Sequence, residues 1–140
     1  MKYKYAVYCS GNASRLFRFY DIYSFENFPL NLIYYDGMNA EVEEKLKSKF
    51  DQKTVEVFSK YDAGKNITRK KSESVSEELN ELLKRRNIDY VYCFGNQILN
   101  PELVNKFKNR IINFHPSILP SFPGLNAIDQ ALQALSLIHI

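Results

Sequence analysis

The sequence contains no tryptophan and only two cysteines in 140 residues. These two, Cys9 and Cys93, cannot build the disulfide framework of a small secreted domain, and both lie in apolar runs that are typical of buried strands. Cys and His do not recur at the close spacing of metal ligands, so we predict no metal site. The thiols are therefore expected to be free and buried, in a cytoplasmic protein.

Long apolar runs and an excess of one charge are also absent. No run approaches the roughly eighteen apolar residues of a membrane-spanning helix, and the N-terminus reaches a polar turn too early for a secretory signal. The formal net charge is +3, with Lys and Arg spread among acidic residues. We therefore expect no membrane partner and no nucleic-acid partner, since a nucleic-acid binder would carry a basic stripe on one face. The sequence also lacks G-x-G-x-x-G, which disfavours a dinucleotide cofactor.

The sequence does contain a regular alternation of strand-like and helix-like segments. The expected strands are 3–9, 30–36, 53–59, 88–94 and 110–114. The expected helices are 14–25, 39–50, 74–87 with a serine cap at Ser74 or Ser76, 100–108 and 126–135, and the polar segment 60–74 is expected to be a loop. Strands that alternate with helices form right-handed βαβ crossovers. The sequence thus predicts a Rossmann-like α/β domain, a mostly parallel sheet with helices on both faces.

A polar cluster follows the first expected strand, at residues 10–14. Ligands of open parallel sheets bind beyond the carboxyl ends of the strands. A glycine turn that leads into a helix offers backbone N–H groups to an anion, and the hydroxyls of Ser10 and Ser14 are further donors. An ordinary strand-to-helix turn explains the same residues, with Gly11 relieving backbone strain and Ser14 capping the helix. The pattern alone leaves both interpretations open.

A second polar cluster ends the last expected strand, in "IINFH". Alternation along a strand places Asn113 and His115 on one side and Phe114 on the other. An Asn amide donates hydrogen bonds to a developing oxyanion, and a His moves protons near neutral pH. Three prolines follow between positions 116 and 123, and they restrict the backbone after the pair. The alternative is a pair that only hydrogen-bonds a turn.

The stretch "INFHPSILPSFPGLNAIDQAL" (112–132) closely resembles the signature of the folate-dependent formyltransferases, especially the glycinamide ribonucleotide branch. In that branch Asn-x-His is followed by Pro-Ser, Leu-Pro and aromatic-Pro-Gly, as it is here. "SGNASRL" (10–16) is similar to the substrate-phosphate loop of the branch, and "FGNQILNPELV" (94–104) resembles the stretch that lines its folate pocket. The three matches occur in the right order and together span nearly the whole chain.

This resemblance implies transfer of a formyl group from 10-formyltetrahydrofolate, a co-substrate, to a primary amine of a small-molecule acceptor. Asn113 would hold the formyl oxygen, and His115 would assist with charge or proton transfer. No metal and no covalent enzyme intermediate are required. The residues implied for binding are Gly11, Asn12 and Ser14 for the substrate phosphate, and Asn96, Gln97, Ile98 and Leu99 for the folate.

The chain also departs from the family at its C-terminal end. The family's third catalytic group is an Asp in a loop a few dozen residues after the His; Asp129 lies inside the last expected helix and is not that residue by position. We expect 1–135 to be an incomplete N-terminal domain and 136–140 a foreign-looking tail, whose His139 is not a site residue. The 140-residue chain is expected to be nearly inactive; the alternative is a nonenzymatic domain that binds a folate or a phosphate compound.

The acceptor stays open, because residues 33–50 and 60–74 have no counterpart that we can place in the glycinamide ribonucleotide branch. Glycinamide ribonucleotide and an amino sugar on a nucleotide carrier are the two main options. An aminoacyl-tRNA is disfavoured, since that branch has Gly where Pro116 stands, and since the net charge is modest. The basic residues of the expected loop fit either contact with a substrate phosphate or a solvated surface: Lys65, Arg69, Lys70 and Lys71.

Overall fold

The computed structural model describes residues 3–23, 30–50, 56–59, 69–114, 121–122 and 126–136. Five parallel strands form one sheet in the order β3-β2-β1-β4-β5. The strands are β1 (Tyr5–Cys9), β2 (Leu30–Tyr35), β3 (Glu56–Ser59), β4 (Tyr90–Phe94) and β5 (Ile111–Asn113). The helices are α1 (Ser14–Ile22), α2 (Ala40–Lys49), α3 (Arg69–Arg86), α4 (Pro101–Lys106) and α5 (Ala127–Ser136). The predicted Rossmann-like α/β architecture is confirmed.

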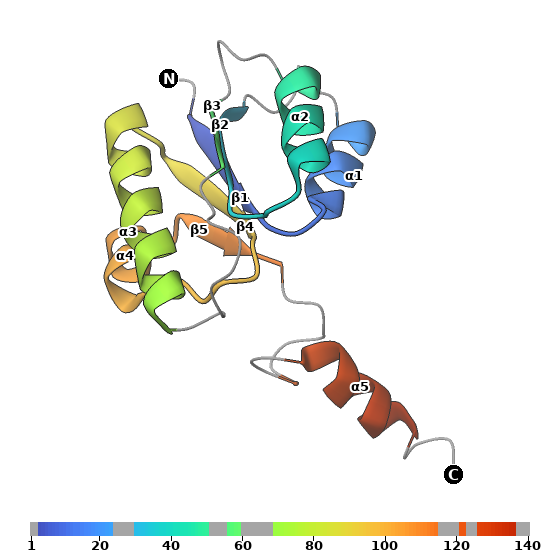
Figure 1. The fold of residues 1–140 in the computed structure, drawn as a ribbon. Coiled ribbons are helices and arrows are strands. Elements are labelled where there is room, and N and C mark those ends of the chain that lie inside the picture. Colours follow the sequence, from blue (N-terminus) through green and yellow to red (C-terminus); the bar gives the residue numbers. More distant parts are fainter. Residues whose placement is uncertain are drawn as a thin grey trace.

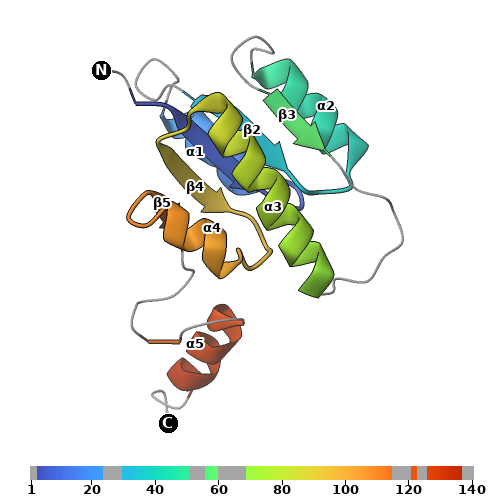
Figure 2. The same cartoon turned by 90° about the vertical axis from the view of Figure 1, so that its left-hand side faces the viewer.

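Helices cover both faces of the sheet. Figures 1 and 2 show α1 and α2 on one face and α3 and α4 on the other, with α5 beyond the sheet and away from both layers. Alternate residues of β1 serve the two cores: Val7 and Cys9 pack with α1 and α2, whereas Ala6 and Tyr8 pack with α3 and α4. Since the central strands are buried on both sides, they read as continuous apolar runs.

Local sequence signals fix the helix beginnings that lie near the carboxyl ends of the strands. The side chain of Asn39 caps α2, because its Oδ1 accepts hydrogen bonds from the N–H groups of Glu41 and Val42 at 2.9 and 3.3 Å. Asn100 caps α4 by accepting from the Leu103 N–H at 2.9 Å, and Pro101 takes the first helical position, where its missing N–H has no cost. The loops after β2 and β4 therefore end at defined points.

The loop expected at 60–74 is partly wrong. Helix α3 begins at Arg69, so the described residues 69–74 are helical, while 60–68 lie outside the described residues. Composition misled the prediction, because Lys, Arg and Glu are polar but form helices well. The expected cap at Ser74 or Ser76 is wrong too: Ser76 is fully buried inside α3, and its Oγ accepts a hydrogen bond from the Asn100 N–H at 2.9 Å.

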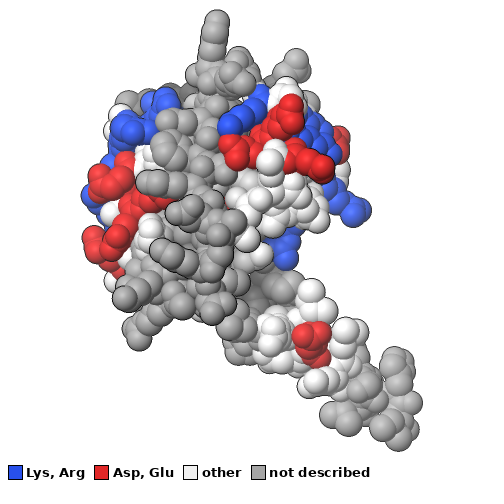
Figure 3. All heavy atoms as spheres, in the orientation of Figure 1, with Lys and Arg blue, Asp and Glu red and all other residues white. Residues whose placement is uncertain are grey.

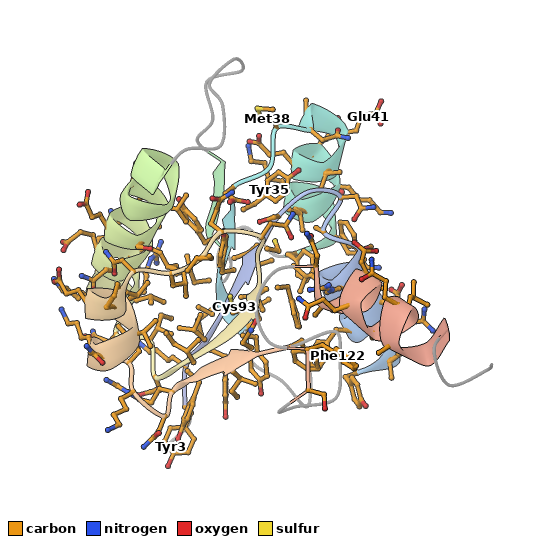
Figure 4. The ribbon with its side chains drawn as sticks, turned by 90° about the horizontal axis from the view of Figure 1, so that it is seen from below. Tyr3, Tyr35, Met38, Glu41, Cys93 and Phe122 are labelled. Atoms are coloured by element: carbon orange, nitrogen blue, oxygen red, sulfur yellow. The ribbon has the colours of Figure 1, made fainter. Side chains whose placement is uncertain are left out.

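The described surface carries both signs of charge. Figure 3 shows acidic and basic side chains interleaved on the face in view. No described helix is long and apolar enough to cross a membrane. Within the described ranges no group of three or more His, Cys, Asp or Glu side chains is placed to hold a metal ion. Cys9 and Cys93 are free and buried, as predicted, and Figure 4 shows Cys93 on the central sheet between α3 and α1.

Candidate active site

The strand order reverses at β1, because β2 and β3 lie to one side of it and β4 and β5 to the other. In an open parallel sheet this reversal opens a crevice at the carboxyl ends of the two strands that flank it. The crevice therefore lies where Cys9 of β1 pairs with Phe94 of β4. A cavity of about 170 Å³ lies at this position, and residues 9–16, Phe94 and Asn96 line it.

A hydrogen bond from a tyrosine of β2 fixes the loop after β1. The Tyr35 hydroxyl donates a hydrogen bond to the Gly11 carbonyl oxygen at 2.6 Å, and Asn12 Oδ1 accepts one from the Ser14 N–H at 3.2 Å. Gly11 has a φ of 60°, as expected of a glycine that relieves strain. The expected cap is wrong, because Ser14 is the first helical residue and Ala13, with a φ of 51°, occupies the N-cap position without a side-chain hydrogen bond.

Arg15 gives the cavity its charge. It is the second residue of α1, and among the described residues that line the cavity it alone carries a charge. The first turn of the same helix lines the cavity, and a helix N-terminus carries a partial positive charge. The arrangement therefore favours an anionic group in the cavity.

The stretch after β4, residues 95–99, forms the opposite wall. Its Asn96 N–H donates to Ser10 Oγ at 2.9 Å, which ties this stretch to the loop after β1. Ile98 is 67% exposed, whereas Leu99 packs against the core on the α3 and α4 face. The two walls that the sequence motifs predicted separately are thus joined by one hydrogen bond, and the 95–99 stretch presents an apolar side chain to solvent.

A buried pair, Tyr8 and Asp36, lies beneath this wall. The Tyr8 hydroxyl donates to Asp36 Oδ2 at 2.8 Å and accepts from the Gln97 N–H at 3.2 Å. Asp36 is buried at the carboxyl end of β2. Burial, followed by the negative charge of Asp36, raises the pKa of Tyr8 far above its ordinary value. Tyr8 therefore keeps its proton and remains a donor to the carboxylate at neutral pH.

Asn113 lies at the carboxyl end of the edge strand β5. It pairs with Cys93, whose side chain belongs to the core on the α3 and α4 face, so Asn113 points to that face and is exposed. Phe114 points the other way, with its ring centroid 5.2 Å from that of Phe94. The predicted opposition of Asn113 and Phe114 is confirmed, and His115 lies outside the described residues.

The sequence analysis missed Tyr8, Asp36 and Arg15. The sequence did indicate Asp36 as a site candidate, because it is a carboxylate directly after an apolar strand, and that position is the ligand-binding edge of a parallel sheet. Arg15 follows the expected phosphate loop directly and was indicated in the same way. The sequence contained no indication for Tyr8, because an aromatic residue inside an apolar strand cannot be distinguished from an ordinary core residue.

A parallel sheet of order 3-2-1-4-5, with a polar crevice where the order reverses and an Asn at the end of β5, defines a Rossmann-like α/β domain. Residues 3–136 match the family model described as formyl transferase. The chain belongs to the formyl transferase family.

Relatives with solved structures have the same fold. The phosphoribosylglycinamide formyltransferase of Bacillus halodurans is 29% identical with a TM-score of 0.70, over 94% of this chain and 65% of that one. The enzyme of that name from Streptococcus pneumoniae is 32% identical with a TM-score of 0.68, over 95% and 67%.

A curated relative shows the same likeness. The phosphoribosylglycinamide formyltransferase of Haemophilus influenzae is 25% identical over 132 residues, which cover 94% of this chain. Its match covers 59% of that protein, so the chain spans somewhat more than half the length of this relative.

Proposed function

We propose that the protein transfers the formyl group of 10-formyltetrahydrofolate to a primary amine of a small, phosphate-bearing acceptor. Membership of the formyl transferase family supports the reaction class. Relatives named for phosphoribosylglycinamide support an acceptor that carries a phosphate. The observation that carries the proposal is the joined crevice: the Asn96 N–H bonds to Ser10 Oγ, so residues 95–99, which we assign to the donor and call the donor wall, meet the loop after β1 at one cavity.

The acceptor phosphate is assigned to the loop after β1. Gly11, Asn12 and Ser14 line the cavity with Arg15, and the first turn of α1 adds its partial positive charge. A ribonucleotide phosphate and the phosphates of a nucleotide-linked amino sugar share this chemistry, so glycinamide ribonucleotide and an amino sugar are both candidates.

The donor is assigned to residues 96–99, with Ile98 as the exposed apolar surface for its ring system. In the reaction the acceptor amine forms a bond to the formyl carbon, and the bond from that carbon to the folate nitrogen breaks. The proton lost by the amine ends on the folate nitrogen. Asn113 is assigned to the formyl oxygen, where its amide donates a hydrogen bond as negative charge develops, and His115 is assigned to the proton transfer by its position in the motif.

The test is transfer by the purified protein. The protein is incubated with 10-formyltetrahydrofolate and either glycinamide ribonucleotide or a nucleotide-linked amino sugar, and the formylated product is measured by mass spectrometry. The Asn113→Ala/His115→Ala double variant is the control and is expected to form no product while remaining folded. Product formed equally by the variant would contradict the site assignment. Folate binding without product from either acceptor would agree with the inactivity expected of the 140-residue chain and with the binding-only alternative.

A further inference from the structure

Four side chains form a row across the sheet on the face that α3 and α4 cover. Tyr34, Tyr8, Cys93 and Asn113 are register partners on β2, β1, β4 and β5. Register partners in a parallel sheet point to the same face, and neighbouring strands lie about 4.8 Å apart. Tyr8 therefore shares a row with the Asn assigned to the formyl oxygen, two strands away from it.

The two tyrosines of this row use their hydroxyls differently. Their ring centroids lie 5.7 Å apart. The Tyr34 hydroxyl donates to Glu78 Oε2 of helix α3 at 2.9 Å, which is a bond within the core layers. The Tyr8 hydroxyl bonds instead to Asp36, to the backbone of residue 97 and to the Ser10 side chain, all at the carboxyl edge of the sheet.

The direction of the Tyr8 bonds is fixed by Asp36. A hydroxyl has one proton to donate, and the Tyr8 hydroxyl donates its hydrogen bond to the buried carboxylate of Asp36 at 2.8 Å. The Tyr8 oxygen is left with its lone pairs facing the Gln97 N–H at 3.2 Å. Donation to a charged group strengthens the oxygen as an acceptor, because hydrogen bonds in a chain polarise one another. Asp36 thus acts on residue 97 through Tyr8.

The Tyr8 ring fixes the same stretch sterically. A Cβ added at Gly95 would lie 2.0 Å from Cε1 of this ring, so the backbone of residue 95 lies directly against it. Tyr8 therefore holds residue 95 by contact and residue 97 by a hydrogen bond. Ser10 holds residue 96 between them.

We propose that Tyr8 is a positioning residue for the folate donor, and that Asp36 orients its hydroxyl so that residues 95–99 keep the conformation that receives the pterin. This inference rests on the proposed function, which assigns the donor to that stretch. Tyr8 touches neither substrate; it acts through the backbone of residues 95 and 97. Tyr34 has the same chemistry on the same face, but its hydroxyl donates to Glu78 of helix α3 instead.

The test compares Tyr8→Phe with Tyr34→Phe in the full chain. Each variant loses one hydroxyl group with its hydrogen bonds and keeps its ring, so both should lower thermal stability. We expect Tyr8→Phe to raise the Kd of 5-formyltetrahydrofolate about tenfold, measured by titration calorimetry on folded protein, and Tyr34→Phe to change it less than about twofold. The affinity for glycinamide ribonucleotide should stay unchanged in Tyr34→Phe, and in Tyr8→Phe it should change less than the affinity for the folate. Asp36→Asn keeps an acceptor for the Tyr8 proton and should recover most of the affinity that Asp36→Ala loses.

Amide exchange of Gln97, followed by NMR, reports the same hydrogen bond without any ligand. Its protection should fall in Tyr8→Phe and persist in Tyr34→Phe. Equal folate affinity in the wild type and Tyr8→Phe would overturn the inference while leaving the proposed function intact. If the wild type binds no reduced folate, the proposed function fails, and the donor role of Tyr8 falls with it. Equal losses in both tyrosine variants would mean a role in stability alone.

Discussion

Gly95 lies so close to Tyr8 that a side chain at position 95 would overlap the tyrosine ring. A Cβ there would lie 2.0 Å from Cε1 and 2.1 Å from Cζ, and nonbonded carbon atoms cannot lie that close unless one of them moves. Tyr8 is fully buried between the sheet and its helices, so the ring has no room to retreat. The wall after β4 can therefore approach β1 only with a glycine at this position.

Gly95→Ala should destabilise the protein by about 1–3 kcal/mol, because the added methyl overpacks a filled core. The measurement is the free energy of unfolding in urea. A Tyr8→Leu background removes the ring atoms that the methyl meets, so the same substitution should cost much less there. Additive effects of the two changes would show that the close contact is not the cause.

Arg15→Ala should weaken binding of a phosphate-bearing acceptor about three- to tenfold, because the cavity then loses the charged side chain among its described lining residues. The KM for the acceptor should rise with little change in kcat. Arg18→Ala is the matched control, since Arg18 is exposed on the same helix and does not line this cavity. A loss in Arg18→Ala equal to that in Arg15→Ala would point to the general charge of the helix instead.

Asn113→Ala should lower kcat about 100-fold while leaving the KM of both substrates nearly unchanged, because the amide is assigned to charge that develops only during the reaction. Steady-state kinetics check this split. Asn113 is exposed, so the stability cost should be small. Asn105→Ala, at an exposed position of α4, is the control and should leave kcat unchanged. A raised KM with an unchanged kcat in Asn113→Ala would assign the residue to ground-state binding.

The sequence was sufficient to predict the architecture and the placement of two walls of the site. Alternating strands and helices fix a parallel sheet, and a parallel sheet fixes where its ligands bind. The cluster at 10–14 follows β1 directly and Asn113 is the last residue of β5, so the strand pattern was enough to locate both. The motif resemblance then indicated the family, and the family match confirms that membership.

The sequence was insufficient to predict the buried hydrogen bonds that support the site. Tyr8 and Tyr34 have the same sequence context, since each lies inside an apolar strand. Yet the Tyr8 hydroxyl bonds to Asp36 at the carboxyl edge of the sheet, and the Tyr34 hydroxyl bonds to Glu78 of α3. That difference depends on which partner each hydroxyl meets after the sheet has assembled, and strand periodicity carries no such information. The beginning of α3 was missed for a related reason: polar helix formers such as those around Arg69 show no apolar stripe.

Asn39→Ala should destabilise the protein by about 1 kcal/mol, because two N–H groups in the first turn of α2 lose their acceptor. Thermal unfolding measures the loss. Asn39→Asp is the matched variant and should be nearly neutral, since a carboxylate accepts the same bonds and suits the positive end of the helix. Equal destabilisation by Ala and Asp would show that the cap contributes little.

Stability should fall as the pH rises into the alkaline range. Burial raises the pKa of the thiols of Cys9 and Cys93, and burial together with the nearby carboxylates of Asp36 and Glu78 raises the pKa of the hydroxyls of Tyr8 and Tyr34. In the unfolded chain thiols ionise near about 8.5 and phenols near about 10. Above these values the unfolded state binds fewer protons than the folded one, so the free energy of unfolding decreases with pH. The full contribution is present below about pH 8.

The urea midpoint, measured between about pH 7 and 11, should therefore decline first with the thiols and then more steeply with the tyrosines. Tyr34→Phe removes one of the raised phenols and should flatten the decline above about pH 10. Tyr3→Phe is the control for the loss of a tyrosine hydroxyl, because Tyr3 is 56% exposed. The same slope in Tyr34→Phe as in the wild type would mean that the buried phenol of Tyr34 does not contribute to the loss, and the decline would then have to come from other groups.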